Sequence, residues 1–190
     1  MLKIISHLFA TLITTTACAQ QLASEQKSTV TSKPDLNKFL FWQSKIDRQG
    51  CTGDVEAPDE RLIRIVDLTA DRKLLQFTCD FGAYQDSYQN YIIDSAGNIL
   101  ETLSFMVPSE DNYKLLKSSK VTWGSMILNT ENELELLYLS AGSGACGYRA
   151  TYKIDAVLLG TSTAPLAVYG DMNCYNGELV PNWPKLSLPD

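Results

Sequence analysis

The chain has 190 residues and carries 16 basic and 22 acidic side chains, which give a formal net charge of −6. Hydrophobic residues make up 45% and charged residues 20% of it, the composition of a globular protein with room for a real core, and the length fits one domain. Because an acidic chain repels phosphate backbones, nucleic acid is excluded as an expected partner.

The first residues have the pattern of a secretory signal peptide, which we place at residues 1–18. One lysine, Lys3, precedes an apolar run that is too short to span a bilayer, and small residues follow. Two cleavage positions are open: before Gln20, after an Ala-Cys-Ala site, or before Cys18, which would then be lipidated. We favour lipidation, so that the membrane is contacted only through a lipid anchor. Both readings export the chain, to the periplasm, the outer membrane or the extracellular space.

Removal of the signal peptide also removes His7, the only histidine of the sequence. Without an imidazole, Ser-His-Asp catalysis, histidine-ligated metals and imidazole acid–base chemistry are excluded. No cofactor and no metal site are therefore predicted.

A polar segment and a helix come next. Residues 20–34 are rich in Ser, Thr and Gln and predict a flexible tether, so that residues 35–190 form a single disulfide-stapled domain. A helix is predicted to begin after Asp35, a plausible N-cap, and to end before Gly50. Its apolar face is expected to contain Leu36, Phe39, Leu40 and Ile46.

From Arg61 onward, apolar residues alternate with polar ones and predict β-strands. Residues 74–79 place Leu75, Phe77 and Cys79 on one face. Residues 148–158 predict one long strand, and residues 166–174 repeat the pattern. The apolar sides of these two strands are expected to contain Tyr148, Ala150, Tyr152, Ile154, Ala156 and Leu158 in the first, and Leu166, Val168, Met172 and Cys174 in the second.

Turn signals separate the strands at residues 94–98, 129–132 and 160–165. Short strands with brief connections favour an antiparallel meander. The predicted fold is therefore mainly β, a sandwich or barrel with one N-terminal helix, and an α+β arrangement is the alternative.

Besides Cys18 the chain has four cysteines, an even number that favours disulfides in an exported protein. No C-x-x-C spacing is present for a zinc site. Three pairings are open, and we favour Cys51–Cys79 and Cys146–Cys174. The second has a geometric reason, because a hairpin about residues 160–163 would bring its two cysteines together. The first rests on sequence proximity alone.

Three glycines surround Ser143 in the segment 141–149. Such a loop can hold a nucleophile or let the backbone turn close to a disulfide. We favour the structural interpretation, because the segment lacks the G-x-S-x-G pattern and no histidine could activate the serine.

The segments "CDFGAY" (residues 79–84), "GSGACG" (residues 142–147) and "NWP" (residues 182–184, after Cys174) resemble those of an exported bacterial family known as domain of unknown function 1176. The chain differs from the family pattern at Ala145, where an acid is more common, and at Gln85, where asparagine is usual. The resemblance implies a location in the cell envelope and a shared cysteine framework, and no activity.

Because the lack of a histidine excludes imidazole chemistry, carboxylates are the remaining candidates for catalytic groups. Residues 54–60 contain four acids, and Asp80 follows Cys79. A glycosidase needs two carboxylates about 5–10 Å apart across a cleft. Acids in loops are more commonly solvated, so an enzyme is the less favoured hypothesis.

Aromatic side chains are the better indication of a binding site. Tyrosine and tryptophan offer flat contact area with a polar tip to glycans and to protein partners. The alternative is that these side chains fill the core, as tyrosine often does in strands. The binding candidates are Asp80, Tyr84, Tyr88, Arg149 and Trp183, with Tyr91 as a further aromatic residue of the same segment.

The function that we favour is that of a non-catalytic exported domain of the envelope or extracellular space, which binds a protein or a glycan. One alternative is a carboxylate-dependent enzyme that acts on polysaccharides, and another is an inhibitor of a secreted hydrolase. A glycan-binding protein should show exposed aromatic side chains beside polar groups, and an inhibitor should show a projecting, ordered loop.

Overall fold

The structure is a computed structural model that describes residues 36–46, 51, 62–109, 114–141, 144–160, 163–171 and 182–188. The predicted signal peptide and tether, Asp35 and Gly50 lie outside the described residues. Within the described ranges, neither helix has the length and hydropathy needed to cross a membrane.

The helices and strands, in chain order, are α2 (Leu36–Lys45), β1 (Ile63–Asp67), β2 (Arg72–Asp80), β3 (Ser87–Asp94), β4 (Ile99–Thr102), β5 (Phe105–Pro108), β6 (Leu116–Ser119), β7 (Val121–Trp123), β8 (Met126–Leu128), β9 (Glu133–Leu139), β10 (Gly147–Lys153), α3 (Ile154–Leu158) and β11 (Ala167–Asp171).

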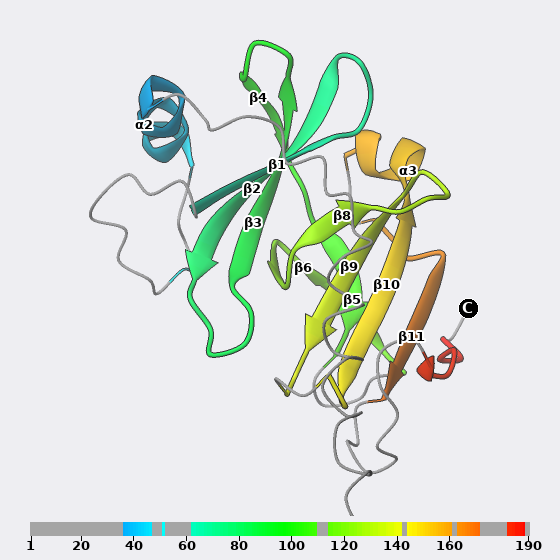
Figure 1. Ribbon diagram of the computed structural model, residues 1–190. Helices are drawn as coiled ribbons and strands as arrows, with labels where there is room; N and C mark the ends of the chain where they lie inside the picture. The colour runs from blue at the N-terminus through cyan, green and yellow to red at the C-terminus, as the bar shows by residue number, and fades with distance from the viewer. Residues whose placement is uncertain are drawn as a thin grey trace, which may run out of the picture.

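The described strands form three antiparallel sheets (Figure 1). The five-stranded sheet has the order β1-β2-β3-β4, with β7 pairing with β3, and the four-stranded sheet has the order β11-β10-β9-β8. Strands β5 and β6 form a two-stranded sheet. The predicted mainly β, antiparallel fold with an N-terminal helix is confirmed.

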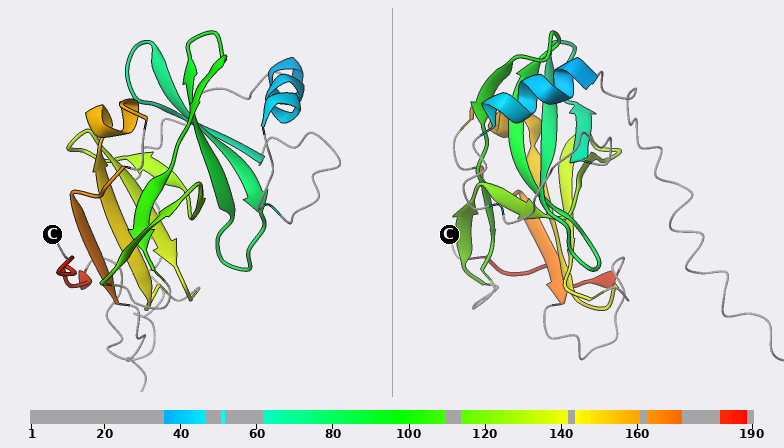
Figure 2. Two further views of the ribbon diagram at one scale, coloured as in Figure 1. Left: turned by 180° about the vertical axis from the view of Figure 1, so that it is seen from behind. Right: turned by 90° about the vertical axis from the view of Figure 1, so that its left-hand side faces the viewer.

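Two hydrophobic cores lie on opposite faces of the five-stranded sheet. Along β2, Leu74 belongs to a core shared with the four-stranded sheet, whereas Leu75 and Phe77 belong to a core shared with α2. This division follows from the period-two alternation of side chains along a strand. Figures 1 and 2 accordingly show α2 and the four-stranded sheet on opposite sides of the five-stranded sheet. The predicted shared face is confirmed for Leu75 and Phe77, which belong to the same core, and Cys79 is buried as well.

Helix α2 packs through a face that the sequence predicted only in part. Phe39 and Ile46 are buried as expected, but Leu40 is 49% exposed. The missing member is Trp42, which is 1% exposed and donates its Nε1–H to the carbonyl oxygen of Gly97 at 2.7 Å. The spacing of Phe39, Trp42 and Ile46 is the i, i+3, i+7 pattern of one helical face.

Two details of the predicted hairpin near the C-terminus are wrong. Strand β10 ends at Lys153, and Ile154–Leu158 form the short helix α3 instead of continuing the strand. Leu166 lies before β11 and is exposed rather than buried. The hairpin itself is confirmed, because β10 and β11 pair with Ala150 opposite Val168. Met172 and Cys174 lie outside the described residues.

The predicted turn at residues 94–98 connects β3 and β4. Asp94 accepts hydrogen bonds from the backbone N–H and from the side-chain Nδ2–H of Asn98, both at 2.8 Å. Gly97 has a φ of 91°, a left-handed conformation in which glycine has no Cβ clash. These hydrogen bonds, the Asn98 side chain first, lower the pKa of the exposed Asp94 carboxyl below its ordinary value.

We expect Asn98→Ala to raise the pKa of Asp94 towards the ordinary aspartate value, because the strongest hydrogen bond to the carboxylate is lost. Because the pKa of Asp94 is lower in the folded state, its ionised carboxylate stabilises the fold at pH values above the ordinary aspartate pKa. This stabilisation is lost as the pH falls through the folded-state pKa. A carboxyl-detected NMR titration checks this. The pKa should stay low in the control Asn129→Ala, since Asn129 lies in the separate β8–β9 turn.

A disulfide joins Cys51 to Cys79, as the sequence predicted from proximity, with the two Cα atoms 4.8 Å apart. Cys146 is also disulfide-bonded. Its favoured partner Cys174 lies outside the described residues, so that pairing stays a prediction. Disulfides form and persist in oxidising compartments, and the protein therefore matures outside the reducing cytoplasm.

Candidate binding site

A pocket of about 250 Å³ opens where β5, β6 and β7 meet the end of β2 and the strands β9 and β10. Its buried lining residues are Val107, Pro108, Thr122 and Tyr148. Its more exposed part carries a carboxylate, an ammonium group and an indole. The described residues that line it are Asp80, Val107, Pro108, Lys117, Ser119, Val121, Thr122, Trp123, Tyr138 and Tyr148.

Tyr138 and Tyr148 form one aromatic wall of this pocket. They are directly opposite each other on β9 and β10, with ring centroids 5.1 Å apart and planes tilted by 40°. Cross-strand aromatic pairs stabilise each other, so the wall is held rigidly by the four-stranded sheet. Trp123, 38% exposed, comes from β7 of the five-stranded sheet. Together with Val107, Pro108, Lys117 and Ser119 of the two-stranded sheet, these residues assemble the pocket across all three sheets.

The loop between β2 and β3, which approaches Trp123 through Gly82, carries two further exposed aromatic side chains. Phe81 and Tyr84 of this loop are 54% and 65% exposed. Gly82 packs so closely that a Cβ there would lie 2.8 Å from the Trp123 ring. We call Phe81, Tyr84 and Trp123 the aromatic rim. The loop that carries the first two projects from the sheet in Figures 1 and 2.

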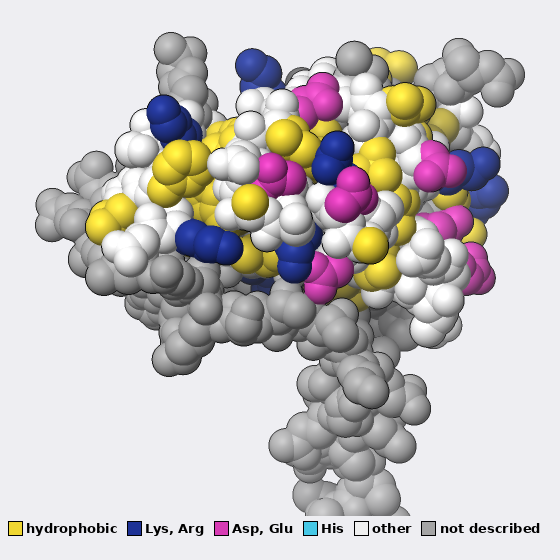
Figure 3. All heavy atoms as spheres, turned by 90° about the horizontal axis from the view of Figure 1, so that it is seen from above, with side chains coloured by type: hydrophobic (Ala, Val, Ile, Leu, Met, Phe, Trp, Pro, Cys, Tyr) yellow, Lys and Arg dark blue, Asp and Glu magenta, His cyan; other side chains and the backbone are white. Residues whose placement is uncertain are grey.

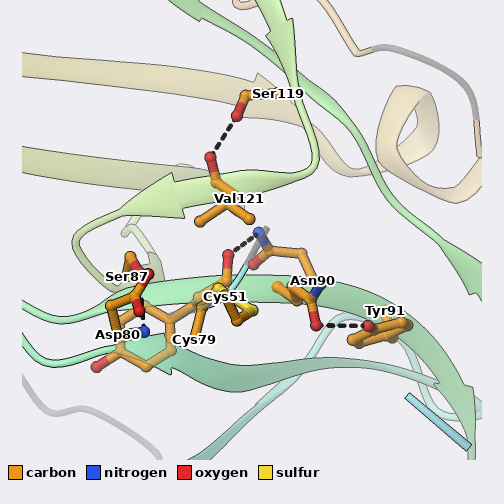
Figure 4. Close-up of a disulfide and its surroundings, with 10 residues drawn as sticks. Cys51, Cys79, Asp80, Ser87, Asn90, Tyr91, Ser119 and Val121 are labelled. Atoms are coloured by element: carbon orange, nitrogen blue, oxygen red, sulfur yellow. Dashed lines mark hydrogen bonds between the residues drawn. A yellow bond between two sulfur atoms is a disulfide. The ribbon is translucent and has the colours of Figure 1, made fainter. Parts of the chain in front are cut away.

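The end of β2 directs Asp80 to the pocket. The β2–β3 register shifts between Thr78 and Asp80, an irregularity that locally re-aims side chains. The hydroxyl of Ser87 accepts a hydrogen bond from the Asp80 backbone N–H at 3.1 Å and lies 3.4 Å from the Asp80 carboxylate. Figure 4 shows Asp80 and Ser87 together beside the Cys51–Cys79 disulfide. The disulfide therefore holds the strand end that supplies the acid of the pocket.

Gln85 holds the β2–β3 loop against the four-stranded sheet. Its Nε2–H donates to the carbonyl oxygen of Leu137 at 2.9 Å, and its Oε1 accepts from the backbone N–H of Leu139 at 2.6 Å. The side-chain amide thus makes the two hydrogen bonds that a neighbouring strand would make with β9, beyond the last residue paired with β8.

We expect Gln85→Ala to free the β2–β3 loop and to lower the free energy of unfolding by roughly 1–3 kcal/mol, because two partly buried hydrogen bonds are lost. The specific readout is hydrogen exchange, in which the amide of Leu139 should lose protection. Gln43→Ala on α2 is the matched control and should leave that amide protected. Unchanged exchange at Leu139 in Gln85→Ala would contradict this role.

Two of the predicted binding candidates lie at this site and three do not. Asp80 lines the pocket and Tyr84 belongs to the aromatic rim. Tyr88 and Trp183 are buried, at 5% and 4% exposure, as is Tyr91, so the core alternative is correct for these three aromatic residues. Burial raises the pKa of Tyr88. The smaller effects of its two charged neighbours oppose each other, since Arg64 lowers this pKa and Asp86 raises it.

Arg149 lies away from the pocket. It follows Tyr148 on β10 and therefore points to the opposite face of the four-stranded sheet, where its guanidinium carbon is 5.0 Å from the ring centroid of Tyr169. On the same face, burial raises the pKa of Glu135, and the charge of Arg149 counteracts this rise. We assign Arg149 to this surface cluster.

The other candidate catalytic residues, the acids of residues 54–60 and Ser143, lie outside the described residues. Asp80 is the one acid among the described residues that line the pocket. The described part of the chain also contains no group of three or more Cys, His, Asp or Glu side chains arranged to hold a metal ion.

Several site residues escaped the sequence analysis, namely Phe81, Lys117, Ser119, Thr122, Trp123 and Tyr138. Phe81 lies in the quoted segment 79–84, where an aromatic residue next to a glycine and a tyrosine is a usable signal. Lys117, Ser119, Thr122 and Trp123 belong to short strands without a motif, and Tyr138 lies in the longer strand β9.

Compared with known proteins, the chain matches no family model, no curated protein and no solved structure. The resemblance to the family of domain of unknown function 1176 therefore stays a prediction. The site has to be interpreted from its own geometry.

Proposed function

We propose that the protein is a non-catalytic binding domain of the bacterial cell envelope that recognises a glycan at the pocket and its aromatic rim. The observation that carries this proposal is the exposed indole of Trp123 at a pocket lined by both apolar and polar side chains. In this proposal the domain is exported and tethered to a membrane through lipidated Cys18.

Sugars match this arrangement of groups. A pyranose ring has a face of C–H groups that packs on an aromatic ring and an edge of hydroxyls that needs hydrogen-bonding partners. Trp123 supplies the ring, while Asp80 and Lys117 supply a charged acceptor and a charged donor. The volume of about 250 Å³ is below the roughly 300–1,000 Å³ of sites for drug-sized ligands, so the pocket suits one sugar unit of a longer chain.

We expect Trp123→Ala to reduce the affinity for the bound glycan by at least roughly tenfold, because stacking on an aromatic ring contributes about 1–3 kcal/mol in comparable ring–ring contacts. The measurement is a titration with soluble oligosaccharides, including cellotriose and chitotriose, followed by calorimetry and by tryptophan fluorescence. Because Trp42 and Trp183 are buried, Trp123 should dominate the ligand-induced fluorescence change.

Leu159→Ala is the control, since Leu159 is 81% exposed on the turn after α3 and is not part of the pocket lining. It should bind as the unmodified protein does. If no oligosaccharide binds, or if Trp123→Ala binds equally well, glycan recognition at this pocket is wrong.

A second candidate function is supported by the β2–β3 loop. Phe81 and Tyr84 project from a loop that Gln85 fixes to β9 and the disulfide anchors at its base, which is the form of a loop that enters the cleft of a secreted hydrolase. In that case Tyr84→Ala should abolish inhibition of the hydrolase. Binding of a glycan that depends on Trp123 and not on Tyr84 would favour the first function.

A further inference from the structure

The outward face of α2 exposes two large apolar side chains that are neighbours in the sequence. Leu40 is 49% and Phe41 is 40% exposed, although Phe39 and Trp42 on either side of them are buried in the core shared with the five-stranded sheet. A helix that only packs on a sheet carries polar residues at its outward positions. Adjacent exposed apolar side chains instead mark a surface that contacts another molecule or a lipid.

Basic side chains flank these two residues. Lys38 precedes Phe41 by three positions and Lys45 follows it by four, so both lie on the same side of the helix as Phe41. Both lysines are exposed, and α2 contains no acidic residue. We call Lys38, Leu40, Phe41 and Lys45 the α2 face. In Figure 3, hydrophobic and basic side chains gather on the left, where α2 lies in Figure 1, and acidic side chains lie towards the middle and the right.

The charge of the whole chain is divided in the same sense. Residues 20–48 carry five basic and three acidic side chains, a net charge of +2, whereas residues 49–190 carry ten basic and nineteen acidic ones, a net charge of −9. An anionic surface attracts the first part and repels the second. Because salt screens charges beyond about 8 Å at physiological ionic strength, such a surface interacts mainly with the side turned towards it.

The position of α2 in the fold suits contact with a flat surface. The helix packs on the face of the five-stranded sheet opposite to the four-stranded sheet, and the right-hand view of Figure 2 shows it in front of the sheet. The pocket is lined by residues of β2, β5, β6, β7, β9 and β10 and by none of α2. A domain that lies with α2 on a surface therefore leaves its pocket uncovered.

We propose that the α2 face docks on the surface of a membrane that contains anionic phospholipids. Leu40 and Phe41 enter the headgroup region, and Lys38 and Lys45 lie near the lipid phosphates. The inference rests on the envelope location of the proposed function and is independent of glycan recognition. It adds a second membrane contact to the lipid anchor at Cys18, and two such signals together give more stable attachment than one. Helix α2 is also the first described element after residues 20–34, so it is the part of the domain nearest to that anchor along the chain.

The test uses the exported chain with Cys18→Ser, which removes the site of lipid attachment and keeps the Ala-x-Ala pattern for cleavage before Gln20. Binding is measured by sedimentation with vesicles of phosphatidylcholine alone and with vesicles that also contain phosphatidylglycerol. The chain should bind the anionic vesicles at least roughly tenfold more strongly, because each lysine near an anionic surface contributes to the attraction. This preference should weaken as the salt concentration is raised.

In the same chain, the double change Leu40→Ser, Phe41→Ser should lower binding to the anionic vesicles by at least roughly tenfold, because the apolar side chains that enter the headgroup region are lost. Leu100→Ser is the matched control, since Leu100 is 48% exposed on β4, and it should bind as the parent chain does. The double change Lys38→Gln, Lys45→Gln should remove most of the preference for anionic vesicles. Circular dichroism checks that each variant is folded.

Equal binding to both kinds of vesicle, binding to neither, or unchanged binding in the Leu40→Ser, Phe41→Ser variant would overturn the proposal. A dimer that becomes a monomer in this variant, measured by analytical ultracentrifugation, would show that the α2 face joins two copies of the chain, and would overturn membrane docking. The titration with oligosaccharides reports on the pocket separately. Glycan binding without vesicle binding would therefore overturn only this inference.

Discussion

Replacing Cys51 with serine is expected to lower the free energy of unfolding by roughly 3–4 kcal/mol, because the bond to Cys79 closes a loop with a sequence separation of 28. For a domain of this size, such a loss corresponds to a fall in Tm of roughly 10 °C. The effect should be large because the bridge joins Cys51, which follows α2 in the chain, to Cys79 of strand β2, which is 1% exposed.

Thermal unfolding followed by circular dichroism checks this, with and without reductant. The variant Cys51→Ser should lose the sensitivity to reductant that this bridge confers, and the double variant Cys51→Ser, Cys79→Ser should unfold at a similar temperature. The Cys146 disulfide is present in all of these proteins, so any sensitivity to reductant that remains in the variants is its contribution. An unchanged Tm in both variants would contradict a stabilising role for the bridge.

The second large effect is expected at Gly124, in the turn between β7 and β8. Its φ is 87°, and an added Cβ would lie 2.0 Å from the carbonyl oxygen of Leu137 on β9. Gly124→Ala therefore combines unfavourable backbone geometry with a clash against backbone, which cannot move aside as a flexible side chain would. We expect a loss of roughly 3 kcal/mol or more in the free energy of unfolding.

Gly97→Ala separates the two contributions. Gly97 has a similar φ of 91°, but the nearest atom to an added Cβ is Cζ2 of Trp42 at 3.4 Å, an ordinary contact. This variant should lose only about 1 kcal/mol, the cost of the left-handed conformation. Urea unfolding of both variants measures the difference. Equal losses would mean that the close approach of Gly124 to Leu137 contributes nothing.

Clear periodicity made much of the fold predictable. The alternation in β2 placed Leu75 and Phe77 correctly, because their side chains point into the core shared with α2 while Leu74 points into the other core. It failed after Lys153, where Ile154 and Val157 are spaced as i and i+3 and are buried on a helix instead. A short apolar segment satisfies both periods, and only tertiary packing decides between them.

The candidate site could not be predicted in the same way. Asp80 and Tyr84 stood out as chemistry-bearing residues in a segment between strands. Ser119 and Trp123 carry no local signal, since their positions beside Tyr148 depend on how the three sheets pack together. The buried hydrogen bonds that orient the amides behind the site join residues 32 and 50 positions apart, Asn90 with Thr122 and Gln76 with Met126. No sequence pattern encodes such an assignment.

The amide of Gln85 has a consequence for solubility. An uncovered stretch of β9 would present the N–H of Leu139 and the carbonyl of Leu137 to any extended chain, and exposed edges of this kind promote aggregation. A single side chain occupies both groups without adding a strand that could itself recruit another molecule. The same glutamine that positions the loop therefore protects the molecule from joining its neighbours edge to edge.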